Sequence, residues 1–134
     1  MPLRTYRVGS PRKRGEGLRI GTVRFPPRGV HKEDYARLDF FDVWFPVVAP
    51  SRALMTWVKK HDIAGDAAAN RAFHQRYARE LETNPAVRQS IHLLAALAQK
   101  TSIAVGCFCE DENNCHRSTL KKVIEKASKD LPKR

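Results

Sequence analysis

Residues 103–120 read IAVGCFCEDENNCHRSTL, and this stretch decides the fold that we expect for the chain. Its first five residues are apolar or small and too few for a helix, which predicts a buried strand. All three cysteines follow in the next loop, and a Cys-His-Arg triplet leads from that loop into a predicted helix. A strand that turns into a helix is typical of α/β proteins, whose ligands bind beyond the carboxyl ends of the strands. This turn is therefore the first candidate for a functional site.

Earlier in the chain, apolar and polar side chains alternate over residues 3–8 and 18–25, which predicts two more strands. The apolar run over 41–48 predicts a strand or an extended buried segment, and Pro46 makes a central place in the sheet unfavourable. The last strand is expected over residues 101–107, which include the apolar run at 103–107. A loop over 28–34 is expected to enter a short helix.

Apolar residues at helical spacing predict helices over 51–60, 66–82 and 84–99, with Ser51 and Asn84 as caps of the first and third. A last helix is expected after Asn113 or Asn114, each a suitable N-cap. Early strands, central helices and a final strand-loop-helix unit predict an α/β fold over residues 1–134. We expect a single small layered domain with a few-stranded, mostly parallel sheet flanked by helices.

Composition limits the class of protein. The chain has 134 residues, enough for one core, and its longest apolar runs fall far short of the about 20 residues that span a bilayer. No apolar segment follows the basic N-terminal residues, so we expect no secretory signal, no membrane association and a cytoplasmic location. Three clustered cysteines do not form a secreted disulfide framework; they indicate free thiols, metal ligands or a nucleophile.

The net charge of +11 lies mainly at the two ends of the chain. Residues 1–29 carry eight Lys or Arg against one Glu, and residues 117–134 carry seven against two acidic residues. If both ends lie on one face, they form a surface suited to phosphate, nucleotide or nucleic acid. The alternative is that residues 12–14 form a solvated loop and residues 129–134 a flexible tail.

The cysteine loop admits three interpretations. Cys107, Cys109, Cys115 and His116 offer four zinc ligands, but a Cys-x-Cys pair on an extended strand points to opposite faces, so the spacing is poor evidence for zinc and we expect no metal or other cofactor. Alternatively, Cys109 or Cys115 is a nucleophile whose thiolate is favoured by the helix N-terminus, with His116 as its base or partner. In the third interpretation the cysteines only pack against the strand and helix. Arg117 is expected to clamp an anion if the loop is a functional site, and to pair with the acidic residues 110–112 if it is only structural.

A second motif, RFPPRG at residues 24–29, precedes Lys32. The two prolines stiffen the turn, which predicts an anion site formed by Arg24, Arg28 and Lys32, or else an exposed turn with solvated charges. Asp42 and Ser51 are further candidates for ligand binding, and Asp42 is also a candidate base. Their alternatives are an ion pair, for example with Arg28, and a helix cap.

The chain resembles the domain-of-unknown-function 488 family, the YeaO-like proteins. The resemblance depends on five motifs that occur in order along the chain. The first two are RFPPRG followed by Lys32, and Asp42-x-Trp44 leading to Ala49-Pro50-Ser51. The others are Leu54-x-x-Trp57, Phe73-x3-Tyr77-x2-Glu80-Leu81 and the Cys-x5-Cys-His-Arg loop before a helix. The family is defined by sequence and implies no particular reaction. Its usual Arg-Leu-Trp-Pro-Arg-Gly segment has Phe25-Pro26 here in place of Leu-Trp.

These observations give one leading hypothesis and one alternative. The first is a phosphate or nucleotide binding cleft between residues 24–32 and the cysteine loop, with Cys109 or Cys115 as the nucleophile and His116 as the base if the protein is an enzyme. Arg28 and Arg117 would then hold the anion. The alternative is a noncatalytic nucleic-acid binder that uses its basic ends.

Overall fold

The computed structural model describes residues 3–109 and 115–132, which form a four-stranded parallel sheet and four α-helices. The strands are β1 (Leu3–Arg7), β2 (Leu18–Gly21), β3 (Val43–Trp44) and β4 (Ile103–Cys107), in the order β1-β4-β2-β3. The helices are α1 (Arg52–Lys59), α2 (Ala67–Thr83), α3 (Pro85–Lys100) and α4 (His116–Lys129), with short 3-10 turns at Lys32–Asp34 and Pro46–Val48. The predicted α/β class with a parallel sheet is confirmed.

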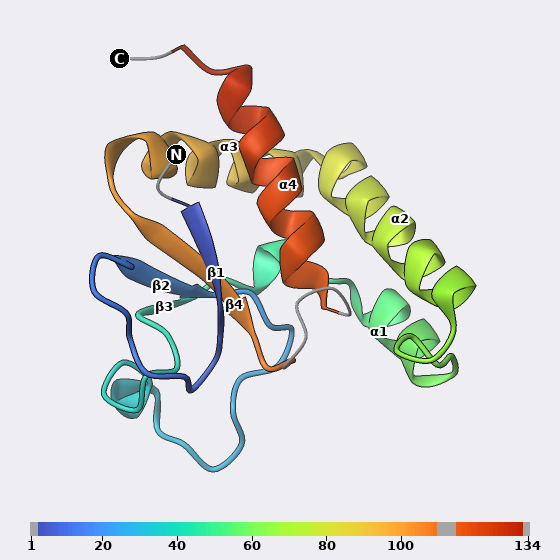
Figure 1. Ribbon diagram of the computed structural model, residues 1–134, viewed down its shortest axis with the longest axis horizontal. Helices are drawn as coiled ribbons and strands as arrows, with labels where there is room; N and C mark the ends of the chain where they lie inside the picture. The colour runs from blue at the N-terminus through green and yellow to red at the C-terminus, as the bar shows by residue number, and fades with distance from the viewer. Residues whose placement is uncertain (1–2, 110–114, 133–134) are drawn as a thin grey trace.

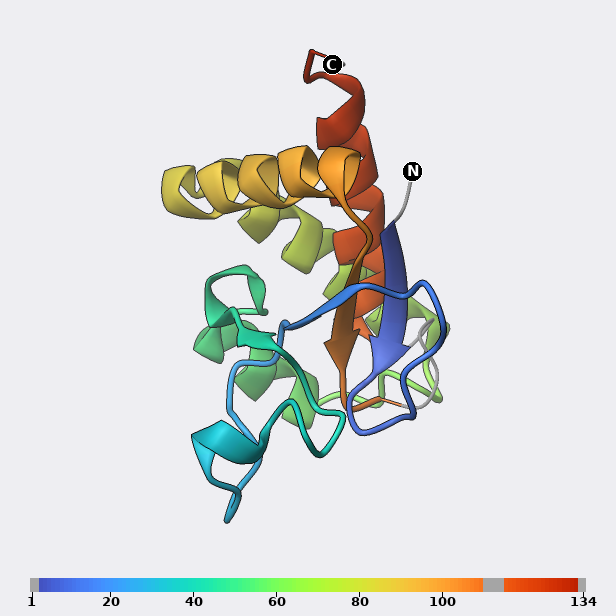
Figure 2. The same ribbon diagram turned by 90° about the vertical axis from the view of Figure 1, so that its left-hand side faces the viewer.

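The last strand of the sequence, β4, lies between β1 and β2 and pairs with both in parallel. Val105 is level with Thr5 on one side and Ile20 on the other. Figure 1 shows α4 alongside β1 and β4, and Figure 2 shows these two strands side by side and pointing the same way. Because all strands are parallel, their carboxyl ends meet at one edge of the sheet.

Helices cover one face of the sheet. Side chains from β1, β2 and β4 pack there against α2, α3 and α4 in a continuous apolar core that includes Leu3, Ile20, Tyr77, Leu94 and Leu120. The three predicted central helices, α1 to α3, are present with ends shifted by at most one residue. Two of their caps are the expected ones: Ser51 accepts from the Leu54 N–H, and Asn84 accepts from the N–H groups of Ala86 and Val87.

The opposite face is covered by the segment before β3 rather than by a helix. Gly21 and Gly106 are level in neighbouring strands, and a Cβ on either would overlap an aromatic ring, of Phe41 and Tyr6 respectively. The Tyr6 hydroxyl donates to the Phe40 carbonyl at 2.7 Å. Two glycines in adjacent strands therefore make room for the aromatic layer that replaces a helix here.

A buried ion pair fixes the loop between β1 and β2 on this second face. The Arg19 side chain is fully buried over the Tyr6 ring and contacts the Glu16 carboxylate at 2.5 Å. Its remaining donors reach the carbonyls of Ser10, Pro11 and Asp39. Burial acts to raise the pKa of Glu16, but hydrogen bonds from Arg19 and the Lys13 N–H outweigh it and hold that pKa below its ordinary value.

Some predicted boundaries were wrong. Strand β2 ends at Gly21 instead of residue 25. The Thr22 N–H makes one more hydrogen bond, to the Gly106 carbonyl. The strand does not continue beyond it because the prolines at 26 and 27 have no N–H to donate. The 41–48 run divides into the edge strand β3 and a 3-10 turn. Cys115 is the N-cap of α4; Asn113 and Asn114, the predicted caps, lie outside the described residues. No helix within 3–109 or 115–132 is long and apolar enough to cross a membrane.

We expect Glu16→Gln to lower the free energy of unfolding by about 3–5 kcal/mol, because it leaves the Arg19 charge buried without its carboxylate. Urea titration measures the change. Glu33→Gln, at an exposed position, is the matched control and should alter stability by less than about 0.5 kcal/mol.

The pH dependence gives a second check on this ion pair. The lowered pKa of Glu16 stabilises the folded state above the ordinary glutamate pKa, and this stability is lost as pH falls through the folded-state value. The stability difference between the wild type and Glu16→Gln should therefore shrink in acid. A difference that stays constant into strong acid would contradict the assignment.

Candidate functional site

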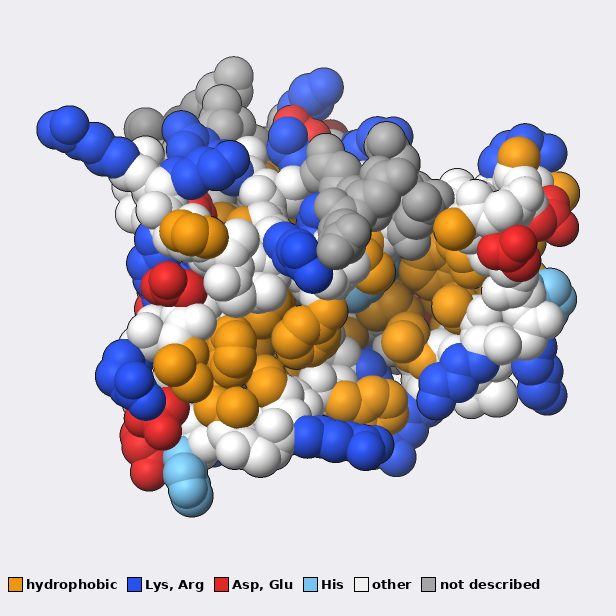
Figure 3. All heavy atoms as spheres, turned by 60° about the horizontal axis from the view of Figure 1, so that its bottom comes forward, with side chains coloured by type: hydrophobic (Ala, Val, Ile, Leu, Met, Phe, Trp, Pro, Cys, Tyr) orange, Lys and Arg blue, Asp and Glu red, His pale blue; other side chains and the backbone are white. Residues whose placement is uncertain are grey.

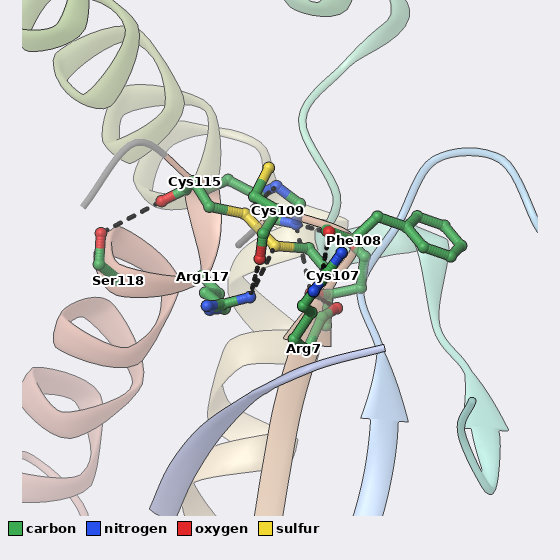
Figure 4. The surroundings of a disulfide bond; sticks show 10 residues. Arg7, Cys107, Phe108, Cys109, Cys115, Arg117 and Ser118 are labelled. Atoms are coloured by element: carbon green, nitrogen blue, oxygen red, sulfur yellow. Dashed lines mark hydrogen bonds between the residues drawn. A yellow bond between two sulfur atoms is a disulfide. The ribbon is translucent and has the colours of Figure 1, made fainter. Parts of the chain in front are cut away.

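Three sulfurs gather at the carboxyl edge of the sheet, where β4 turns toward α4. Cys107 is the last residue of β4, Cys109 lies two residues beyond it, and Cys115 is the N-cap of α4. Their Sγ atoms all lie within 4.8 Å of one another. Cys107 and Cys115 form a disulfide, while Cys109 is a free, exposed thiol (Figure 4).

The expectation that Cys107 and Cys109 point to opposite faces was only partly correct. Cys107 is buried and Cys109 exposed, as alternation requires. However, the strand ends at Cys107 and the chain bends at Phe108, which brings the two sulfurs back together. The Phe108 side chain points away from the sulfurs in Figure 4 and is 45% exposed.

His116, in the first turn of α4, joins this helix to the end of β2. Its Nε2 lies 2.7 Å from the Thr22 carbonyl oxygen and 3.3 Å from the Thr22 hydroxyl. A carbonyl oxygen only accepts, so Nε2 carries the proton and donates. Nδ1, which lies 3.8 Å from the Cys115 sulfur, is left with its lone pair.

Burial makes this imidazole neutral. It lowers the pKa of His116 from 6.5 to about 4, with the charges of Arg117 and His74 acting in the same direction and the hydrogen bond to Thr22 opposing them. At neutral pH His116 is therefore an uncharged ring whose Nδ1 is able to accept a proton or bind a metal.

Arg117 extends under the cysteines from the same turn of α4 (Figure 4). Its Nη1 donates to the Cys109 carbonyl at 2.7 Å and lies 3.5 Å from the Cys107 sulfur. Burial raises the pKa of the Cys109 thiol, and the Arg117 guanidinium acts against that rise. The cluster therefore combines a reachable thiol, a neutral histidine and a buried cation.

Two of the predicted anion-binding residues lie together elsewhere. Arg24 donates to the carbonyls of Ala49 and Pro50 at 3.0 Å each, and Ser51 donates to the Glu80 carboxylate while capping α1. Arg24, Ser51 and Glu80 share the wall of a cavity of about 420 Å³ between the segment after β3 and the α2–α3 turn. Their polar groups hold backbone and side-chain partners in this arrangement.

The other three predicted ligand residues do not join the cysteine cluster. Asp42 receives two hydrogen bonds from Arg12, at 2.8 and 3.0 Å, and one from the Arg19 N–H, so its ion-pair partner is Arg12 rather than Arg28. Burial acts to raise the pKa of Asp42, but these bonds bring it below its ordinary value. Arg28 and Lys32 are exposed on the segment that follows β2.

Sequence reasoning missed two residues that shape the site. Thr22 supplies the carbonyl that orients His116, and Arg7, at the end of β1, donates to the Phe108 carbonyl at 3.3 Å. Neither belongs to a recognisable motif. Their only sequence signal was weak: Arg7 lies near the end of the predicted strand 3–8, and Thr22 lies inside the predicted strand 18–25. The observed strands end at Arg7 and Gly21, and both flank β4.

Fold and site together define a small parallel α/β protein with a cysteine, histidine and arginine cluster at the carboxyl edge of its sheet. A family model described as the active DUF488-N3 subclade (DUF488-N3a) matches residues 3–128. The chain therefore belongs to this family, and the predicted membership of the domain-of-unknown-function 488 proteins is confirmed. Neither the curated proteins nor the solved structures gave a match to the chain.

The lowered pKa of His116 predicts a loss of stability in acid. Between pH 6.5 and about 4 the unfolded chain binds a proton at this residue that the folded chain does not, so stability falls as pH falls through that window, by roughly 3 kcal/mol in total. We expect His116→Gln to flatten this part of the pH profile in urea titrations. His92→Gln, at an exposed position on α3, should leave the slope unchanged, and an equal slope in all three proteins would exclude a buried neutral His116.

Proposed function

We propose that this protein is a thiol-dependent enzyme acting on a phosphate-bearing substrate, such as a nucleotide or a nucleic-acid end. Cys109 is the nucleophile and Arg117 the cation that favours its thiolate. The observation that carries the proposal is an exposed free thiol whose own carbonyl is held by a buried guanidinium at the start of a helix. Reactive cysteines are typically partly exposed and close to a cation. Here burial still leaves the pKa of Cys109 above its ordinary value, and Arg117 limits that rise without cancelling it.

Cys115 is the second candidate for the nucleophile. It occupies the N-cap of α4, and His116 Nδ1 faces its sulfur. Its disulfide with Cys107 and its burial keep it from a substrate in this form, so it becomes available only after reduction. Cys109 is preferred because it needs no such step.

Affinity for an anion is supported by the charges at this edge. The α4 N-cap side chain makes no capping hydrogen bond, and a helix N-terminus attracts negative groups. Arg7 lies beside Phe108, and Arg28 and Lys32 are carried by the segment that leaves the same edge after β2. Figure 3, which brings this side forward, shows hydrophobic side chains in the middle of the face, with Lys and Arg and some Asp and Glu around them.

A noncatalytic nucleic-acid binder is the competing function. It is favoured by exposed aromatic rings among the cations: Phe25 is 52% exposed, and the Arg52 guanidinium lies 5.5 Å from its ring centre. Such rings stack on bases. Binding of this kind should weaken steeply with salt and survive Cys109→Ser, because phosphate contacts carry it.

The enzymatic proposal is tested by the reactivity of Cys109. In native protein, iodoacetamide should alkylate Cys109 at a rate that rises toward alkaline pH, since burial raises the pKa of this thiol. Arg117→Met should slow alkylation at neutral pH because it removes the charge that opposes the rise. Lys122→Met, which removes a positive charge from an exposed position of α4, is the matched control and should react like the wild type. Peptide mapping by mass spectrometry identifies the labelled cysteine.

Substrate contact is tested in the same assay with p-nitrophenyl phosphate, a nucleoside 5′-monophosphate and a 5′-phosphorylated oligonucleotide. At least one should slow the alkylation of Cys109 and be attacked by its thiolate at phosphorus, which forms an S–P bond, breaks the P–O bond to the ester oxygen and releases the alcohol or p-nitrophenolate. The phosphorylated Cys109 is then found after a rapid denaturing quench, and Cys109→Ser should abolish it. An adduct that moves to Cys115 after reduction would assign the nucleophile to Cys115. Labelling of every thiol only after unfolding would exclude the enzyme.

A further inference from the structure

We infer that the reduced cysteine cluster is a zinc site in which Cys107, Cys109 and Cys115 supply three thiolates and His116 Nδ1 the fourth ligand. This inference does not depend on the proposed enzymatic function, which needs one thiol, whereas the metal needs all three. It concerns the same edge of the sheet in a different chemical state.

The three sulfurs are close enough to share one ion after reduction. Four-coordinate Zn²⁺ with Zn–S bonds of about 2.3 Å places its sulfurs about 3.8 Å apart. The three Sγ atoms lie within 4.8 Å of one another, and the bonded pair, Cys107 and Cys115, must move apart once the disulfide is reduced. The Cα atoms of Cys107 and Cys115 are 7.4 Å apart. Disulfides usually join Cα atoms separated by roughly 4.4–6.8 Å, and a sulfur-metal-sulfur bridge spans a wider gap.

His116 lies beside the three-sulfur group, close to the Cys115 sulfur, and becomes the fourth ligand if its ring shifts toward the ion on binding. A tetrahedral site with Zn–S of about 2.3 Å and Zn–N of about 2.0 Å separates nitrogen and sulfur by about 3.5 Å; Nδ1 lies 3.8 Å from the Cys115 sulfur. The Nε2 proton is held by the Thr22 carbonyl at 2.7 Å. Histidines that bind zinc commonly donate their other N–H to a carbonyl in this way, which fixes the ring with its lone pair toward the metal.

The surroundings also balance the charge of such a site. Three thiolates and one Zn²⁺ leave a net charge of −1, and the Arg117 guanidinium lies 3.5 Å from the Cys107 sulfur, where it offsets that charge. Cysteine and neutral imidazole are the ligands that Zn²⁺ prefers, and four protein ligands make a closed site. The exposed Cys109 gives the ion its route in from solvent.

Zinc binding requires reduction of the disulfide. A phosphine reductant delivers two electrons and, with water, two protons to the Cys107–Cys115 bond; both sulfurs become thiols and the phosphine becomes its oxide. Zn²⁺ then displaces the protons of the three thiols, so binding releases protons and weakens as pH falls. No electron is transferred in this second step.

The experiment loads phosphine-reduced full-length protein with Co²⁺, then with Zn²⁺, without oxygen. We expect one Co²⁺ per chain with thiolate-to-cobalt charge transfer and the visible bands of tetrahedral cobalt, both lost when Zn²⁺ displaces it. Protein oxidised to the disulfide should bind neither ion. Zn²⁺ should also protect all three cysteines from iodoacetamide, and elemental analysis gives the stoichiometry.

Variants separate the metal site from general thiol binding. Cys109→Ser, at an exposed position, should lower zinc affinity at least 100-fold in competition with a chromophoric chelator. His116→Gln should lower the zinc affinity about 10- to 100-fold. It should also shift the visible cobalt bands, because the nitrogen ligand is lost. His92→Gln should change neither the affinity nor the spectrum. Octahedral cobalt spectra, or unchanged affinity in Cys109→Ser, would overturn the inference. Slow alkylation of Cys109 in metal-free protein would count against the proposed enzyme and leave the zinc site standing.

Discussion

The structure depends on the position of β4 between β1 and β2. Parallel pairing requires long connections, and the chain supplies one by sending α1, α2 and α3 from β3 back to the start of β4. β4 contributes five consecutive buried residues, since one face meets the helices and the other the aromatic layer around Tyr6 and Phe41. The carboxyl ends of three strands consequently surround the loop that holds the cysteines. A strand that ended elsewhere would leave these thiols without the helix, the histidine and the arginine.

The hydrogen bond from His116 to Thr22 determines how the imidazole is placed at this edge of the sheet. It ties the start of α4 to the end of β2 and sets the tautomer of a ring that burial keeps neutral. Arg117, one residue later on the helix, brings a permanent positive charge under the sulfurs. Two neighbouring residues of one helical turn therefore give the cluster opposite properties, a lone pair on one side and a cation on the other.

The sequence predicted the class, the parallel sheet and the helices because each rests on a local pattern: alternation in β1, apolar spacing in α3, and caps at Ser51 and Asn84. The cysteine turn was also found, because its residues lie close together in the chain. The sequence patterns did not predict contacts between segments that are distant in the chain. Arg12 pairs with Asp42 across 30 positions, and the aromatic cover of the second face depends on glycines 85 positions apart, at 21 and 106. Such contacts follow from strand order, which local patterns do not encode.

The polar groups around Arg24 show how much bonding capacity the protein itself can use. Arg24 and Ser51 were expected to bind a ligand, yet both satisfy groups of the protein, the carbonyls before α1 and the carboxylate of Glu80. Chain turns that bury carbonyls need donors, and a half-buried arginine supplies two at once. At the cysteine cluster the balance is reversed, since Cys109 keeps an exposed sulfur and His116 a nitrogen lone pair after their structural bonds are made. Residual bonding capacity, rather than residue type, therefore distinguishes the two polar sites and favours the cysteine edge for chemistry.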